Sequence, residues 1–243
     1  MSAAPECRVA VVTGGARRLG RHLCLSLATR GYDVVIVYRS SDDDARALER
    51  EIAARGGRAR PLKVDVADKQ AVAAAFAGIG AAEGRVDLLV NNVGNYNPQP
   101  VTALDPDVWD DTIAANLSGA YYCCYGALPL MPAGGNIVNI GMAGLEGIRA
   151  NTRGADYYVS KTGLLVLTRA LAAAYAPQQI RVNMVSPGQL DNSVDLPPPE
   201  DISRWVPIGR SGTLDDIAQA VHYLLDATYV TGQNIDVAGG YRL

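Results

Sequence analysis

The sequence predicts an α/β protein with a single-domain Rossmann-type fold, a doubly wound parallel sheet of about seven strands with helices on both faces. Short apolar or β-branched runs recur along the whole chain, and amphipathic helical segments stand between most of them. This alternation is typical of a parallel sheet that helices cover on both sides. No repeat, low-complexity tract or linker divides the series, and 243 residues with 49% hydrophobic side chains can form one substantial core. We therefore expect residues 1–243 to form one domain.

Each element is predicted from its local pattern. Strands are expected at 9–12, 34–38, 60–64, 86–91, 136–140, 180–185 and 234–237. Helices are expected at 19–30, 42–55, 69–83, 106–130, 157–175 and 214–226. The stretch 186–207 is irregular, because Pro187-Gly188 and a later run of prolines prevent regular structure. A loop of this length is often a lid over a site, and an idle surface loop is the alternative.

Charge and composition favour a small-molecule substrate as the partner. The chain has 22 Lys plus Arg against 25 Asp plus Glu, so it presents no bulk field for nucleic acid or an acidic membrane. Its first residues show no basic region followed by an apolar run, and no stretch is long and apolar enough to span a bilayer. We therefore expect a cytoplasmic protein with no nucleic-acid or membrane partner.

A glycine-containing turn follows the first predicted strand and opens the first predicted helix. Residues 13–20 read Thr-Gly-Gly-Ala-Arg-Arg-Leu-Gly. Glycines at a strand-to-helix turn let the backbone approach a pyrophosphate, which free N–H groups and the helix dipole then hold. Gly14, Arg17, Arg18 and Leu19 are therefore candidate cofactor-binding residues. A structural turn with two exposed arginines is the alternative.

The end of the second predicted strand favours a phosphorylated dinucleotide. Tyr38, Arg39 and Ser40 stand where NAD-binding folds place an acidic residue on the ribose hydroxyl. An arginine beside hydroxyl groups suits a 2′-phosphate, so NADPH/NADP+ is the expected cofactor, and Arg18 could approach the same charge. The acidic run 42–44 just beyond is read as the first turn of a helix, and no metal site is expected.

Tyr157 and Lys161 are candidate catalytic residues. At a spacing of four residues their side chains share one helix face, so an ammonium can lie beside a phenol. A nearby cation favours the phenolate and brings tyrosine closer to acting as a general acid or base. Alone, this spacing is a weak signal, and a coincidental surface pair is the alternative.

These motifs together resemble the short-chain dehydrogenase/reductase family over nearly the whole chain. The matching elements stand in the family's order: Thr13-Gly14 with Gly20, Asp65-Val66, Asn91 to Gly94, Asn116, Tyr157 with Lys161, Pro187-Gly188, and 238–240. The resemblance implies adenine contacts from Asp65 and Val66, and a cofactor cleft lined by Asn92, Val93, Gly94, Pro187 and Gly188. It also implies that Asn116 holds a water in a proton relay through Lys161, which binds the nicotinamide ribose. Finally, it implies a homotetramer formed through helices 106–130 and 157–175, although the sequence equally allows a dimer.

Within the family, the details are most similar to pteridine reductases and related dihydropterin reductases. Arg18 replaces the family's usual middle glycine, and Tyr38-Arg39-Ser40 resembles that subgroup's 2′-phosphate clamp. Tyr96 stands where the subgroup carries an aromatic residue that stacks on a flat pterin ring. The alternative for Tyr96 is a loop aromatic that packs on its own fold.

Met142 departs from the family pattern. The family normally has a serine after the fifth strand, and pteridine reductases have an aspartate. A thioether cannot donate a hydrogen bond to a carbonyl oxygen. Thr152, Asn151, Asp156 or Glu146 could fold inward as a substitute. Otherwise the substrate is a C=N bond or conjugated ring that needs only Tyr157, or one of its own groups replaces the hydroxyl. Misplacement of the serine position in this comparison is a further explanation.

The sequence thus predicts an NADPH-dependent reductase of a small cyclic metabolite, acting on an imine, pterin-like or carbonyl group with Tyr157 as proton donor. Tyr96, Met142 and Trp205 are the candidate substrate-binding residues, Trp205 as part of an apolar lid. A helical packing role is the alternative for Trp205. The rival function is a repurposed scaffold that binds NADP(H) and a ligand with little or no redox activity.

Overall fold

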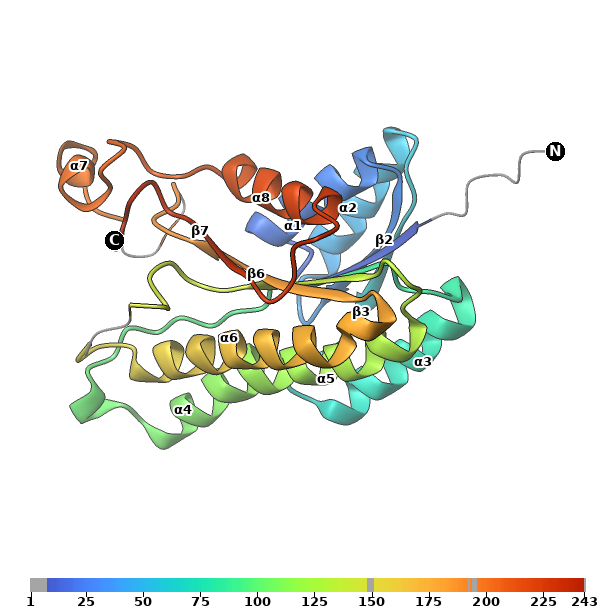
Figure 1. Cartoon of the computed structure of the whole chain (residues 1–243), viewed down its shortest axis with the longest axis horizontal. Helices are drawn as coiled ribbons and strands as arrows, with labels where there is room; N and C mark the ends of the chain where they lie inside the picture. Colours follow the sequence, from blue (N-terminus) through green and yellow to red (C-terminus); the bar gives the residue numbers. More distant parts are fainter. Residues whose placement is uncertain (1–7, 148–150, 192, 194–195, 243) are drawn as a thin grey trace.

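The computed structural model describes residues 8–147, 151–191, 193 and 196–242, which form one seven-stranded sheet with the order β3-β2-β1-β4-β5-β6-β7 (Figure 1). All neighbouring strands pair in parallel. The strands are β1 Arg8–Thr13, β2 Tyr32–Tyr38, β3 Ala59–Lys63, β4 Leu88–Asn91, β5 Asn136–Ile140, β6 Arg181–Pro187 and β7 Asn234–Val237. The predicted fold class is confirmed.

Helices cover both faces of the sheet (Figure 1). One layer is formed by α1 Arg18–Thr29, α2 Asp42–Ala54 and α8 Leu214–Asp226. The opposite layer is formed by α3 Lys69–Glu83, α4 Pro106–Ile113, α5 Gly119–Ala127 and α6 Ala155–Tyr175. A short helix, α7 Ile202–Trp205, lies beyond the end of the sheet.

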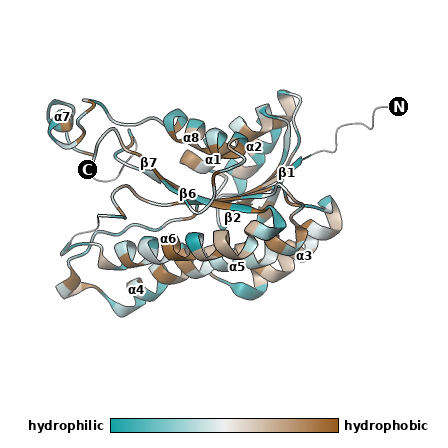
Figure 2. Cartoon of the chain, viewed as in Figure 1, coloured by the Kyte–Doolittle hydropathy of each residue, from teal (hydrophilic) through white to brown (hydrophobic). Residues whose placement is uncertain are grey.

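The central strands are hydrophobic on both faces because helices bury both. Val12, Ile36 and Leu88 pack with the α1, α2 and α8 layer. Val11 and Leu89, one residue out of step, pack with the opposite layer. Successive strand residues point to opposite faces, so a continuous apolar run is what a doubly covered strand needs. In Figure 2 the hydrophobic colour is concentrated along the sheet and on the helix faces turned toward it.

The strand order places the polar strand ends together. Chain connections run outward in opposite directions from β1 and β4, which are neighbours in the sheet. In open α/β sheets, ligands bind outside the carboxyl ends of the strands at such a switch point. The segments that follow β1, β2, β4, β5 and β6 therefore meet at one edge.

The predicted helix 106–130 is interrupted. After α4 the chain forms a π-helical segment, Ala114–Ser118, before α5, and a 3-10 turn, Leu128–Leu130, ends the series. The π-helical segment, whose hydrogen bonds span one residue more than those of an α-helix, contains the candidate residue Asn116. Such bulges occur frequently at functional sites, and residue periodicity does not reveal them.

The predicted lid, 186–207, is only partly regular. Its first residues complete β6, Leu190 forms a bridge with Gly212, and a 3-10 turn, Pro199–Asp201, leads into α7. Residues 192, 194 and 195 lie outside the described residues. The lid function stays a prediction.

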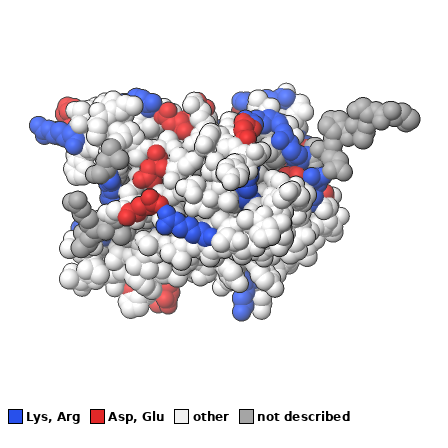
Figure 3. All heavy atoms as spheres, viewed as in Figure 1, with Lys and Arg blue, Asp and Glu red and all other residues white. Residues whose placement is uncertain are grey.

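The surface carries both signs of charge. On the face seen in Figure 3, Lys and Arg side chains and Asp and Glu side chains are scattered over a mostly uncharged surface. Among the helices that the structure describes, none is both long and apolar enough to cross a membrane.

Candidate active site

The turn between β1 and α1 is shaped for a close approach to its backbone. Gly14 has a φ of +62°, and a Cβ on Gly20 would lie 2.1 Å from the Gly14 carbonyl oxygen. Only glycine fits at position 20, and the positive φ favours glycine at position 14. The Asn92 side-chain amide donates to the carbonyl oxygens of Thr13 at 3.0 Å and Gly14 at 3.2 Å. The loop after β4 therefore holds the turn in place.

Arg18 occupies a strained backbone position in this turn. Its φ is +47°, in the left-handed region that costs a non-glycine residue about 1–2 kcal/mol. Strain of this kind persists only when the surrounding structure enforces it. Here it directs an exposed guanidinium toward the cavity beside the turn.

The N-terminus of α1 is open to an anion. The structure shows no side-chain hydrogen bond capping it and no acidic residue in its first turn. The first amides of a helix have no partners within the helix, and the helix dipole favours negative charge there.

These elements surround a cavity of about 430 Å³. Its lining residues are Gly14, Ala16, Arg17, Arg18, Leu19, Gly20, Tyr38, Arg39, Ser40, Ser41, Asn92, Val93, Gly94 and Asn95. None of these residues is acidic, and three are arginines. The cavity thus joins the predicted glycine turn, the predicted phosphate clamp and the loop after β4, and it fits a phosphorylated dinucleotide.

Acidic side chains near the clamp already have cationic partners. Asp42 accepts hydrogen bonds from Lys63 at 2.9 Å and from the Tyr38 hydroxyl at 3.2 Å. The hydrogen bond from Lys63 lowers the pKa of Asp42. Arg39 lies 3.7 Å from Asp65, a loose surface pair of little energetic value. An incoming phosphate can therefore compete for Arg39.

The structure does not bring Asp65 and Val66 into the lining of this cavity. The Asp65 carboxylate accepts from the Ala67 amide at 3.0 Å, and Val66 is buried. Their adenine contacts stay a prediction. Pro187 and Gly188 line a different cavity, described below.

Lys161 is buried beneath the candidate proton donor. Its side chain is 2% exposed, and its Nζ donates to the Ile140 carbonyl oxygen at 2.8 Å. The same Nζ lies 5.8 Å from the centroid of the Tyr157 ring. A Cβ added to Gly94 would be 3.3 Å from it, so Lys161 also reaches the cofactor cavity. The alternative of a coincidental surface pair is excluded by this burial.

Burial lowers the pKa of Lys161 from 10.5 to about 8. The ammonium has lost most of its hydration, which disfavours the charged form. It is still largely protonated at neutral pH, so it places a poorly screened positive charge near the Tyr157 phenol.

Asn116 links the loop after β4 to α6. Its Oδ1 accepts from the Asn95 amide at 2.7 Å, and its Nδ2 donates to the Asn95 carbonyl at 2.9 Å and to Ser160 Oγ at 3.1 Å. Ser160 Oγ donates in turn to the Tyr157 carbonyl oxygen at 2.7 Å. Asn116 therefore positions the start of α6, and its role in a water relay stays a prediction.

A second cavity of about 140 Å³ contains the Tyr157 side chain. Its lining residues are Tyr96, Met142, Ala143, Tyr157, Tyr158, Pro187, Gly188, Gln189, Ser193, Tyr241 and Arg242. The Tyr96 and Tyr157 ring centroids are 4.8 Å apart with the planes inclined at 60°. Tyr96 and Met142 thus lie where the sequence placed them. Trp205 is 57% exposed and outside this lining, and its role in a lid stays a prediction.

In the described part of 142–156, none of the expected substitutes for a serine at position 142 lines this cavity. Asn151 donates to the Tyr158 hydroxyl at 2.8 Å, and the buried Asp156 accepts from Thr112 at 2.7 Å. Thr152 is exposed, and Glu146 forms an ion pair with Arg169. Met142 faces the cavity in their place.

Six lining residues were not among the candidate residues, although two of them, Gln189 and Ser193, lie in the predicted lid: Ala143, Tyr158, Gln189, Ser193, Tyr241 and Arg242. Gln189 directly follows Pro187-Gly188, and Arg242 follows the glycines at 239–240, so each is next to a motif that was recognised. Nothing in their local pattern distinguishes them from ordinary loop residues.

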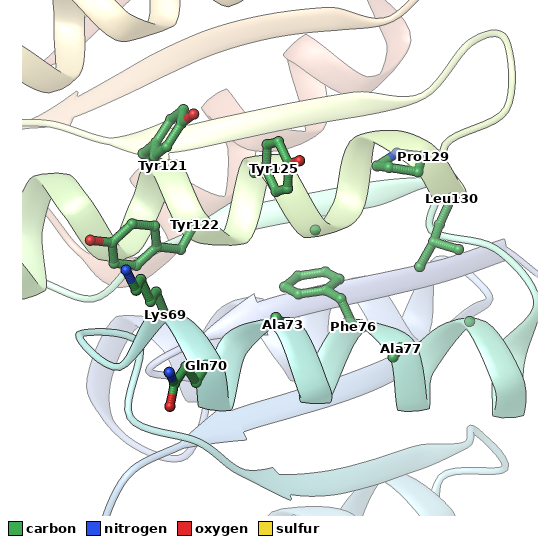
Figure 4. Close-up of a pocket in the computed structure, with 12 residues that line it drawn as sticks. Lys69, Gln70, Ala73, Phe76, Ala77, Tyr121, Tyr122, Tyr125, Pro129 and Leu130 are labelled. Carbon is green, nitrogen blue, oxygen red and sulfur yellow. The ribbon is translucent and has the colours of Figure 1, made fainter.

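A further cavity of about 670 Å³ lies elsewhere, between α3 and α5 (Figure 4). Phe76 and Ala73 of α3 face Tyr122 and Tyr125 of α5 across this apolar groove. It contains none of the candidate reaction residues. It is therefore a candidate protein contact surface.

The fold and the two cavities together define an oxidoreductase with a dinucleotide cleft. The sequence family described as Enoyl-(Acyl carrier protein) reductase matches residues 14–242. The chain is 34% identical over 239 residues to a 3-oxoacyl-(acyl-carrier-protein) reductase FabG of Staphylococcus aureus, covering 95% of this chain and 96% of that one. It is 36% identical over 243 residues to cis-4-hydroxycyclohexanecarboxylate dehydrogenase of Sinomonas cyclohexanicum, covering 96% of each. A blue fluorescent protein from a metagenomic library, solved in complex with NADPH, is 33% identical with a TM-score of 0.89, covering 97% of this chain and 98% of that one. The chain belongs to the short-chain dehydrogenase/reductase family.

The buried charge of Lys161 predicts a stability effect. Below pH 8 the folded protein carries an ammonium that burial disfavours, and this penalty disappears as the pH rises from about 8 toward 10.5. Lys161→Met should therefore unfold with a free energy on the order of 3 kcal/mol higher than wild type at pH 7, and the gap should shrink by pH 10. Urea unfolding at fixed protein concentration measures it, with the exposed Lys69→Met as control. A variant less stable than wild type at pH 7 would contradict the penalty.

Proposed function

We propose that the protein is an NADPH-dependent reductase of a small cyclic metabolite that carries a carbonyl or C=N group. The observation that carries this proposal is the position of the buried Lys161 ammonium. It lies beside Gly94 of the 430 Å³ cavity proposed for the cofactor and beneath Tyr157 of the 140 Å³ cavity. Lys161 is therefore close to both the proposed cofactor site and the proposed proton donor.

The bound cofactor supplies the hydride, and the residues of the chain manage the proton and the charge. Tyr157 donates its hydroxyl proton to the substrate heteroatom as the adjacent carbon is reduced. Lys161 stabilises the phenolate that Tyr157 becomes, because its charge is close and poorly screened by solvent. Met142 donates no hydrogen bond, so in this proposal Tyr157 is the donor to the reacting heteroatom.

NADP(H) is the proposed cofactor. Arg18, Arg39 and Ser40 line the larger cavity, and none of its lining residues is a carboxylate that would repel a 2′-phosphate. The metagenomic blue fluorescent protein, solved with NADPH, supports this choice.

The small size of the second cavity supports a small substrate. The Sinomonas relative is named for a cyclic hydroxy acid, which supports a ring as the reacting group. Tyr96 beside Tyr157 could stack on such a ring, and a pterin-like ring belongs to the same proposal. None of the relatives reported above is named a pteridine reductase. A 3-oxoacyl substrate is the second candidate, supported by the Staphylococcus relative.

The proposal includes self-association through the helices of the α3, α5 and α6 layer. Tyr125 of α5 is 73% exposed and Val166 of α6 is 64% exposed, and the apolar groove of Figure 4 adjoins α5. Exposed apolar patches of this kind mark protein interaction sites. A homo-oligomer, a tetramer or a dimer, is the proposed state.

Tyr157→Phe should lower turnover by at least about a hundredfold, because it removes the proton that the reduced substrate needs. NADPH affinity should survive, since the hydroxyl is not part of the phosphate clamp. NADPH oxidation against dihydropterins, cyclic imines and cyclic ketones measures turnover, and NADPH fluorescence measures affinity. The exposed Tyr223→Phe is the matched control. Full activity in the Tyr157 variant would end the proton-donor assignment, and NADPH binding without turnover of any compound by wild type would favour the repurposed scaffold.

Arg39→Ala should weaken NADPH binding by about tenfold to a hundredfold and leave NADH binding nearly unchanged, because only NADPH carries the 2′-phosphate. Fluorescence titration with both cofactors measures the difference. Arg55→Ala, which removes another arginine of a surface ion pair, is the control. Equal losses for the two cofactors would count against the clamp.

Met142→Ser should raise kcat/KM for plain cyclic ketones by about tenfold or more, because a second hydrogen-bond donor would then face the carbonyl oxygen. Met142→Ala removes the thioether without adding a donor and is the matched control. Steady-state NADPH oxidation measures both variants. If serine and alanine behave alike, the absent hydroxyl does not limit the rate.

A further inference from the structure

Arg242 places a guanidinium at the wall of the reaction cavity. Its Cζ lies 5.3 Å from the Tyr158 ring centroid and 5.0 Å from the Tyr241 ring centroid. Both rings line the same cavity. Two aromatic faces support the cation without neutralising it, because a cation–π contact leaves the charge in place.

The backbone fixes this position. Arg242 has a φ of +62°, and the Tyr241 amide donates to the Ala238 carbonyl oxygen at 3.0 Å. A Cβ on Gly144 would lie 2.9 Å from the Arg242 Cβ, so the loop after β5 packs tightly against it. A non-glycine residue held in the left-handed region points to a functional constraint.

The charge of Arg242 has no acidic partner in the described part of the chain. No Asp or Glu lines the cavity, and the described ion pairs do not include Arg242. Most arginines elsewhere on the surface, Arg17 and Arg210 among them, do have such partners. Arg242 is exposed at the rim of this cavity, and a guanidinium that faces a cavity without a carboxylate is suited to an anionic ligand.

Two neutral groups complete the site. The Tyr158 hydroxyl oxygen accepts a hydrogen bond from the Asn151 side-chain amide at 2.8 Å. Its own hydroxyl proton is then left to donate to a ligand. Gln189 is 8% exposed, and its Oε1 is buried with no partner among the described residues. Since Gln189 lines the cavity, a polar group of a ligand can form the hydrogen bond that its side chain lacks.

We infer that Arg242, Tyr158 and Gln189 bind a carboxylate of the substrate, so that the substrate is a small oxo acid. This inference rests on the proposed reductase function and names its substrate class. Tyr158 stands between the two ends of the site, with its ring centroid 6.4 Å from that of Tyr157 and 5.3 Å from Arg242 Cζ. One small ring carrying a carbonyl at one end and a carboxylate at the other spans that arrangement.

The carboxylate site also gives a reason why Met142 is tolerated. A substrate held at its carboxylate has its carbonyl fixed against Tyr157 without a second donor on the carbonyl oxygen. Orientation of a bound reactant lowers the barrier as effectively as an added contact does.

The test compares benzoate with benzamide, which have nearly the same shape and differ in charge. Isothermal titration of the full chain loaded with NADP+ should show benzoate binding about tenfold to a hundredfold tighter than benzamide, as for hydrogen bonds to a charged group. Arg242→Gln should abolish this preference, and Arg242→Lys should restore part of it. Arg204→Gln, which removes an exposed arginine of α7, should keep it.

NADPH oxidation with 4-oxocyclohexanecarboxylate and its methyl ester provides the second readout. Wild type should prefer the acid through a lower KM, and Arg242→Gln should lose that preference. Equal binding of benzoate and benzamide, binding of neither, or a preference that persists in Arg242→Gln would overturn the carboxylate site. Reduction of neutral ketones without a carboxylate preference would refute this inference alone. A benzoate preference without reduction of any compound would instead refute the proposed function and leave the anion site standing.

Discussion

The buried ammonium of Lys161 is the constraint on which the arrangement of the site depends. An ammonium that is 2% exposed needs a fixed acceptor, and the end of β5 provides it through the Ile140 carbonyl oxygen. A buried chain of hydrogen bonds, from Asn91 through Asn139 to Thr168, ties β4 and β5 to α6. Because α6 is held to the sheet in this way, the position of Tyr157 one helical turn from Lys161 is fixed as well.

The parallel sheet turns this local constraint into a site. The glycine turn after β1, the clamp after β2, the loop after β4 and Met142 after β5 come from distant parts of the sequence, yet they meet at one sheet edge. Asn92 and Asn116 connect them, the first to the glycine turn and the second to α6. The two cavities are therefore positioned by hydrogen bonds between loops, while the buried apolar layers supply the rigid frame.

Most of the sheet and its covering helices could be predicted from the sequence. Strand and helix periodicities are local, and they follow directly from which residues are buried in the two hydrophobic cores. The Tyr157 and Lys161 pair could be predicted because a spacing of four residues has one geometric meaning on a helix. The π-helical segment at Asn116 could not, since it adds no pattern to the chain. Trp205 was assigned to the pocket from its apolar character, but its exposure depends on how α7 packs. Arg242 was missed because only the tertiary fold brings the end of the chain to the loop after β5.

Met142 and Arg242 have a common physical explanation. A hydroxyl beside Tyr157 would act on the substrate's reacting oxygen, whereas under the proposed carboxylate site the guanidinium beside Tyr158 would act on a distant group and select the substrate before the chemistry begins. Contacts to a remote group can supply the orientation that a missing contact at the reacting centre would otherwise provide. If both proposals hold, a chain with a thioether at one end of the cavity and an arginine at the other would depend more on substrate recognition than on activation of the carbonyl. Such an enzyme gains specificity for compounds that carry both groups, and it loses activity on simple ketones that carry only one.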